Sequence, residues 1–73
     1  MEKETEEKIL KLKDKFYNCE IDSNEYRTQL KRIFKGSSIK ILPSRMALIT
    51  FPLDEKTITI DDWDGIKINV KSN

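Results

Sequence analysis

Residues 21–36 read IDSNEYRTQLKRIFKG, and this segment carries the signals of a helix with a defined start and end. Asp22 is a candidate N-cap, and Glu25 follows three residues later, as in a capping box. Ile21 and Tyr26 have the spacing of a hydrophobic staple. The apolar side chains then recur at helical spacing, at Tyr26, Leu30, Ile33 and Phe34. Gly36 suits the left-handed residue that ends many helices, so we predict an amphipathic helix that needs an apolar cover.

The chain before this segment predicts a second helix. Residues 1–35 contain neither Gly nor Pro, and Ile9, Leu12 and Phe16 form a stripe between about Thr5 and Tyr17. The pattern breaks at residues 18–20. Two helices joined by a turn this short favour an antiparallel pair, so we predict a two-helix hairpin over residues 5–35.

The chain after Gly36 changes to a period of two, which is typical of strands. Residues 44–51, 57–61 and 65–71 alternate, and a tight turn at residues 62–65 places Gly65 where a positive φ is needed. Residues 39–42 are a candidate for a further short strand, stopped by Pro43. The side chains predicted to share the inward face are Met46, Leu48, Ile58, Ile60, Ile66, Ile68 and Val70. Ile49 and Phe51 then fall on the other face.

The predicted fold class is α+β. An N-terminal antiparallel two-helix hairpin packs on a C-terminal three-stranded antiparallel β-meander (residues 39–71), and all 73 residues make one small domain. A core this thin gives marginal stability, and the outer strands leave open edges. A homodimer is therefore one expectation.

The composition argues against most enzyme chemistry. The chain has no His, one Cys and two Gly, so it lacks a Ser-His or Cys-His nucleophile, the usual zinc ligands and a phosphate-binding Gly loop. We therefore expect no enzyme activity, cofactor, metal or small-molecule substrate. No apolar run approaches the length of a membrane span, and the acidic start is unlike a signal peptide. The lone Cys19 fits a reducing, cytoplasmic setting.

Asp61-Asp62-Trp63-Asp64-Gly65 is the most acidic spot in the chain. An EF-hand alignment on Gly65 would put Ile60 and Lys71 at two essential ligand positions, which excludes a calcium loop. The simplest interpretation is a hairpin turn that favours Asp and Gly. The alternative is a partner-binding tip, because a rigid exposed Trp among carboxylates could meet a basic protein surface.

Basic side chains mark the outer side of the helices. The candidate binding residues there are Arg27, Lys31, Arg32 and Lys35, with Lys8, Lys11 and Lys15 of the first helix beside them. Such residues are common on solvated helix faces. The alternative is contact with nucleic-acid phosphates, although the net charge of +1 gives no overall attraction to a polyanion.

Residues 12–34 resemble the short helical-hairpin module called the SHOCT (short C-terminal) domain. The resemblance lies in Ile21-Asp22-Ser23-Asn24-Glu25-Tyr26 and in the apolar pair Ile33-Phe34. The family typically has Gly-x-Ile-Thr-x-x-Glu-Phe and a Leu-Leu pair, so Cys19 stands at its Gly position and Asp22 replaces its Thr. The module also lies at the N-terminus here. The resemblance implies an oligomerisation or protein-interaction hairpin without catalytic residues.

These observations predict a small non-enzymatic regulator or inhibitor that binds another protein. Short, charged proteins without catalytic groups are typical accessory products of phages and mobile elements, and an antagonist of a host or defence enzyme is the concrete form of this hypothesis. One alternative is a nucleic-acid-binding regulator that uses the basic helix face. The other is an oligomerisation module.

Overall fold

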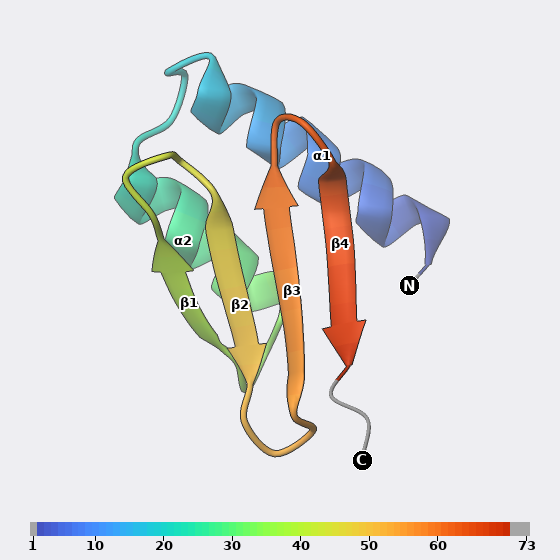
Figure 1. The fold of residues 1–73 in the computed structure, drawn as a ribbon. Coiled ribbons are helices and arrows are strands. Elements are labelled where there is room, and N and C mark those ends of the chain that lie inside the picture. Colours follow the sequence, from blue (N-terminus) through green and yellow to red (C-terminus); the bar gives the residue numbers. More distant parts are fainter. Residues whose placement is uncertain (1, 71–73) are drawn as a thin grey trace.

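Two helices cover one face of a four-stranded antiparallel sheet in the computed structural model, which describes residues 2–70 (Figure 1). The elements are α1 (Lys3–Tyr17), α2 (Ser23–Ile33), β1 (Ser38–Ile41), β2 (Ala47–Phe51), β3 (Lys56–Asp61) and β4 (Gly65–Val70). The strands lie in chain order, β1-β2-β3-β4. Neither described helix combines the length and the apolar character that crossing a membrane requires.

The predicted three-stranded meander is wrong, because the segment that ends before Pro43 is a full strand. Along β1, Ile39 pairs with Ile49 and Ile41 pairs with Ala47. This fourth strand brings two more apolar side chains to the inner face and gives α2 a strand to pack on. The predicted strand end at Lys71 lies outside the described residues.

The helices do not form the simple antiparallel hairpin that the sequence predicts. Figure 1 shows α1 crossing behind β3 and β4, whereas α2 lies behind β1 and β2. The two helices contact each other, and near their connection the Phe16 and Tyr26 rings stack with centroids 4.4 Å apart. A four-stranded sheet offers more apolar surface than one helix can cover, so each helix packs on its own pair of strands.

The predicted inward face of β2 is also wrong. Ile49 pairs with Ile58 and Ala47 pairs with Ile60, and all four side chains are buried. Leu48 instead pairs with Thr59 on the outer face and is half-buried. Directly paired residues of antiparallel strands share a face, so pairing with β3 turns Ile49 inward. The inward assignment of Ile58, Ile60 and Ile66 agrees with this register.

The N-cap at Asp22 and the left-handed Gly36 are confirmed, whereas the capping box is not. Asp22 is the N-cap of α2, and its carboxylate accepts a hydrogen bond from the Glu25 backbone N–H at 2.8 Å. The Glu25 side chain accepts from Gln29 rather than completing the capping box. Gly36 follows the end of α2 with a φ of 81°. These features depend on neighbours only a few residues away, which is why the sequence shows them.

The α1 helix ends in a Schellman motif at a residue that is not glycine. The Cys19 N–H donates to the Phe16 carbonyl at 3.1 Å, and the Glu20 N–H donates to the Lys15 carbonyl at 2.8 Å. This closure requires a left-handed residue, and Cys19 has a φ of 62°. A residue with a Cβ is strained there, since that atom crowds the following carbonyl.

Replacing Cys19 by glycine is therefore expected to stabilise the protein. The Cys19→Gly variant relieves the left-handed strain and should raise the free energy of unfolding by about 1 kcal/mol, measured by urea denaturation. Cys19→Ala keeps a Cβ and removes only the thiol, so it is the matched control and should change stability less. Equal stability of the Gly and Ala variants would contradict the strain argument.

The core contains a buried hydroxyl without a partner. Tyr26 is fully buried, and its Oη is the one buried side-chain N or O atom within residues 2–70 that makes no hydrogen bond. Burial raises the pKa of the Tyr26 phenol well above its ordinary value, and the nearby Tyr17 adds to this effect. A buried polar group without a partner costs about 1–3 kcal/mol.

Tyr26→Phe should consequently raise the free energy of unfolding by about 1 kcal/mol at neutral pH. A raised pKa in the folded state means that stability is fully present below about pH 10, where the unfolded phenol titrates, and is lost as the pH rises through the folded value. Urea denaturation at several pH values should show a steeper loss above about pH 10 in the wild type than in the variant. Identical slopes, or a destabilised variant at neutral pH, would contradict the assignment.

Candidate partner-binding surfaces

The β3–β4 connection is a short turn held by the side chain of the residue that precedes it. Asp61 pairs with Gly65 at the end of the hairpin, leaving three residues, Asp62-Trp63-Asp64, in the loop. One Asp61 carboxylate oxygen accepts from the Trp63 N–H at 3.0 Å and from the Asp64 N–H at 2.6 Å. Gly65 has a φ of 70°, as the turn pattern predicts. The backbone under Trp63 is thus fixed at two amides.

The α1 helix braces this acidic tip, which we define as residues 61–64. The buried Lys13 ammonium lies 3.5 Å from an Asp62 oxygen and 3.2 Å from an Asp14 oxygen. Burial acts to lower the pKa of Lys13, but the hydrogen bonds and charges of the two carboxylates outweigh it, so the pKa is raised. Lys13 therefore remains a cation under the tip and fixes the position of Asp62.

The negative charge of the acidic tip affects the pKa of the nearby Tyr17 phenol. Burial is the main cause that raises the pKa of Tyr17, and the charges of Asp61 and Asp62 raise it further. Asp62 and Asp64 are exposed, whereas Asp61 is half-buried beneath the loop. The acidic tip thus presents two carboxylates to solvent while the third orders the backbone.

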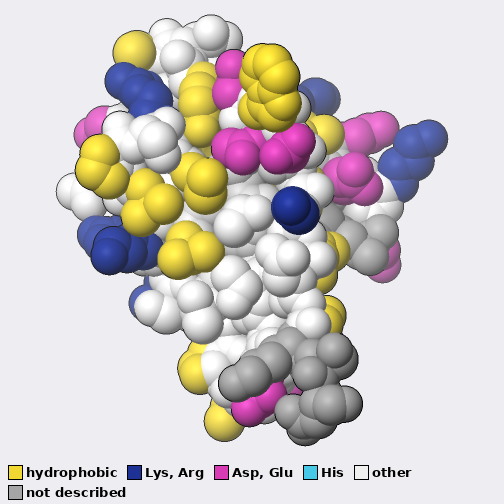
Figure 2. All heavy atoms as spheres, in the orientation of Figure 1, with side chains coloured by type: hydrophobic (Ala, Val, Ile, Leu, Met, Phe, Trp, Pro, Cys, Tyr) yellow, Lys and Arg dark blue, Asp and Glu magenta, His cyan; other side chains and the backbone are white. Residues whose placement is uncertain are grey.

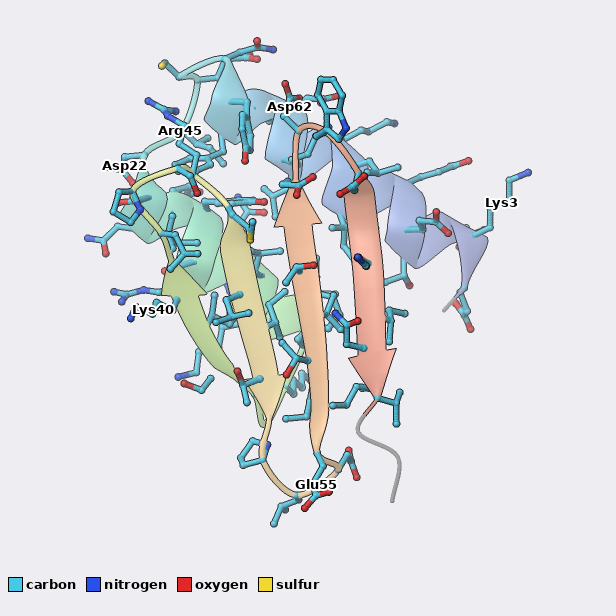
Figure 3. All side chains as sticks on the ribbon, in the orientation of Figure 1. Lys3, Asp22, Lys40, Arg45, Glu55 and Asp62 are labelled. Atoms are coloured by element: carbon cyan, nitrogen blue, oxygen red, sulfur yellow. The ribbon has the colours of Figure 1, made fainter. Side chains whose placement is uncertain are left out.

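Trp63 extends from this turn almost entirely into solvent. Its side chain is 93% exposed, and Figure 2 shows hydrophobic atoms beside carboxylates at the end of the molecule where β3 turns into β4. Figure 3 labels Asp62 there and Glu55 at the opposite end of β3. A large exposed side chain on a fixed backbone loses little conformational entropy on binding, which favours a role in recognition.

The structure divides the predicted basic face. Arg32 lines a groove of about 310 Å³ between α1 and α2, together with Lys8, Lys11 and Lys15, and Leu12 and Ile33 form its apolar part. Arg27 donates to the Asn24 side chain at 3.1 Å and lines a different groove, beside β1. Lys31 and Lys35 are exposed outside both grooves. Only one of the four predicted α2 cations therefore joins the lysines of α1.

The cations of this α1–α2 groove form no ion pair within the described residues. Lys13 makes the ion pairs found among residues 2–70, so no carboxylate of this part of the chain lies within 4.0 Å of the groove cations. Salt screens exposed charges, so any attraction of this groove for an anion should weaken as the salt concentration rises. The groove is open to solvent and suits an extended anion better than an enclosed small molecule.

Arg45 has a structural role that the sequence did not reveal. It lies in the β1–β2 turn, and its guanidinium donates to the Phe16 carbonyl at 2.7 Å and lies 5.1 Å from the centre of the Phe16 ring. A second open groove, of about 620 Å³, separates this turn from the α1–α2 connection; Figure 3 labels Arg45 and Asp22 there. Only the tertiary structure brings these two turns together, so no local pattern could identify the contact.

The side chains that could act as metal ligands do not gather in one place within the described residues. Within residues 2–70, no three Cys, Asp or Glu side chains gather in an arrangement that could hold a metal ion. Comparisons of the chain with protein-family models, curated proteins and solved structures find no match. The resemblance of residues 12–34 to the SHOCT hairpin therefore stays a prediction, and the case for a function rests on the surfaces described above.

Proposed function

We propose that this protein is a non-enzymatic regulator or inhibitor that binds a basic surface of another protein through its acidic tip. The observation that carries the proposal is Trp63, which is 93% exposed on a turn whose backbone Asp61 fixes. The tryptophan would enter an apolar pocket of the partner, and Asp62 and Asp64 would meet cations around it. Aromatic anchors surrounded by charges dominate the binding energy of many protein interfaces.

The mechanism that follows is occlusion. A tip with carboxylates on both sides of an aromatic ring carries the charge that a basic groove attracts, so its binding would block that groove. A cellular enzyme that handles nucleic acid, including a host or defence enzyme, has such a groove. The electrostatic part of this recognition mainly speeds association and selects the partner, whereas Trp63 supplies residence time.

The test is a comparison of two exposed side chains at opposite ends of the sheet. Tagged wild-type protein, Trp63→Ala and Leu53→Ala would be used to capture a partner from source cells, and the affinity of each for the purified partner would then be measured. Leu53 is the matched control, because it is 98% exposed in the β2–β3 turn. We expect Trp63→Ala to weaken binding by about 30-fold or more, and Leu53→Ala to leave it unchanged.

The charge contribution is tested separately at Asp62 and Asp64. Asp64→Asn removes charge from an exposed position and is the clean probe, whereas Asp62→Asn also takes an ion-pair partner from Lys13 and Asp61→Asn would also disturb the turn. The Asp64→Asn and Asp62→Asn variants should slow association and weaken its salt dependence. Full affinity of both of these variants and of Trp63→Ala would overturn the proposal.

The α1–α2 groove favours a second candidate function, the binding of nucleic-acid phosphates. Four cations around one groove should give an affinity that falls about 100-fold between about 50 and 200 mM salt if each meets a phosphate. A gel shift with single- and double-stranded DNA and RNA at both salt concentrations checks this. Arg32→Gln should reduce the salt slope by about one, and Lys31→Gln, outside the groove, should not. No shift at low salt would remove this candidate.

A further inference from the structure

The free edge of β4 has little of the usual protection against pairing. Within residues 2–70, β4 is hydrogen-bonded only to β3, so its other side presents unpaired backbone groups. It is six residues long, contains no Pro, and carries one charged residue, Lys67. The opposite edge is better protected, because β1 has four residues, is followed by Pro43 and packs against α2. Long edges with few charges invite another strand.

The apolar inner face of the sheet is incompletely covered at β4. Ile68 is 47% exposed and Val70 is 65% exposed, although Ile58, the direct partner of Ile68, is buried. The pairing with β3 places Ile66, Ile68 and Val70 on the same face as the core. The helices therefore leave the end of β4 open, where the next strand of a larger sheet would continue the apolar surface.

We propose that β4 pairs with β4 of a second copy of this chain, antiparallel about a two-fold axis at Ile68, so that the two four-stranded sheets form one continuous sheet. In this register Ile68 meets Ile68 of the second copy and Ile66 meets Val70, so every inward pair is apolar. On the outer face Lys67 meets Asn69, and no like charges oppose each other. A register centred on Lys67 would instead place two lysines directly opposite, which is unfavourable.

The two-fold symmetry also brings the α1 helix of the second copy over the exposed Ile68 and Val70 side chains at the end of β4. The axis is perpendicular to the sheet, so both pairs of helices lie on the same face. Figure 1 shows the N-terminal end of α1 extending past β4 on that face, and its first turn carries Lys3, Glu4 and Glu6. In the dimer this end would extend over the second copy, toward Ile68, Val70 and the half-buried Lys56 of the adjacent strand.

The register is tested by two substitutions of opposite charge at one exposed position. Asn69→Glu places a carboxylate opposite Lys67 of the second copy, whereas Asn69→Lys places a second ammonium there. The symmetry makes each of these contacts occur twice in the dimer. Sedimentation equilibrium of the full chain between about 10 and 500 µM should show a dimer in the wild type, tightened by Asn69→Glu and weakened by Asn69→Lys, each by about two- to thirty-fold. Dimerisation that responds equally to both substitutions would overturn the register.

Ile68→Lys places two cations at the symmetry axis and should abolish the dimer. Thr57→Lys, on the outer face of β3 away from the edge, is the charge-matched control and should leave it intact. Trp63→Ala should also leave the dimer intact, so this result is independent of the acidic tip. A wild-type chain that is monomeric at all these concentrations, or an Ile68→Lys variant that still dimerises, would overturn the proposal. If the chain is monomeric and its β4 edge instead pairs with a strand of a different protein, the proposal is also overturned.

Discussion

Ile49→Ala is expected to lower the free energy of unfolding by about 3–4 kcal/mol, whereas Leu48→Ala should lower it by about 1 kcal/mol or less. Ile49 is fully buried in β2, where it is flanked by Ile39 of β1 and Ile58 of β3. Truncation leaves a cavity bounded by two strands and the helix layer, which cannot easily collapse. Leu48 lies on the outer face between Lys40 and Thr59. Solvent can therefore fill most of the space that a shortened side chain leaves there.

Urea and thermal denaturation of both variants check this difference. In a domain of this size the loss at Ile49 should lower the melting temperature by about 20 °C, and part of the variant population should be unfolded at 37 °C if the wild type is only marginally stable. Ile49→Val, which removes one methyl group, is the graded control and should cost about 1 kcal/mol. A larger loss for Leu48→Ala than for Ile49→Ala would mean that β2 faces the other way.

Arg45→Ala is expected to lower the free energy of unfolding by about 2–3 kcal/mol, a large effect for an exposed residue. The guanidinium donates a charged hydrogen bond to the Phe16 carbonyl at the end of α1 and lies over the Phe16 ring. The charged bond is worth about 1.5–3 kcal/mol and the ring contact about 0.5–1 kcal/mol. The cation also suits the negative end of the helix dipole.

The backbone does not confound this measurement. Arg45 has a φ of 72°, and alanine has the same left-handed cost as arginine, so Arg45→Ala isolates the side chain. Arg45→Lys keeps the charge but loses the planar geometry, and it should show an intermediate loss. Urea denaturation gives the free energies. A change below about 0.5 kcal/mol for Arg45→Ala would show that this contact does not hold the β1–β2 turn to α1.

The features that the sequence predicted correctly are those whose cause lies within a few residues. The cap at Asp22, the left-handed Gly36 and the turn at Gly65 each involve atoms of adjacent residues. The left-handed conformation of Cys19 also has a local cause, in the end of α1, but the sequence did not predict strain there.

The candidate site was predictable in part. The acidic tip is continuous in sequence, so its residues are necessarily together, although the exposure of Trp63 and the bracing by Lys13 are tertiary facts. The basic face was predicted as one surface, but the direction of each side chain around α2 separates Arg27 from Arg32. Their neighbours come from β1 and α1, respectively, and a helical pattern alone does not place those elements.

The sequence alone determined that two helices precede the strands, from the change of hydrophobic period, and it determined where α2 begins and the acidic turn, because hydrogen bonds between near neighbours specify these. Only the tertiary structure decided that the sheet has four strands, that Ile49 rather than Leu48 faces the helices, and that Arg45 reaches the end of α1. β2 has apolar residues on both of its faces, so its own alternation is ambiguous. Pairing with Ile58 and Ile60 resolves it, because a one-residue shift would place a Thr of β3 against the core.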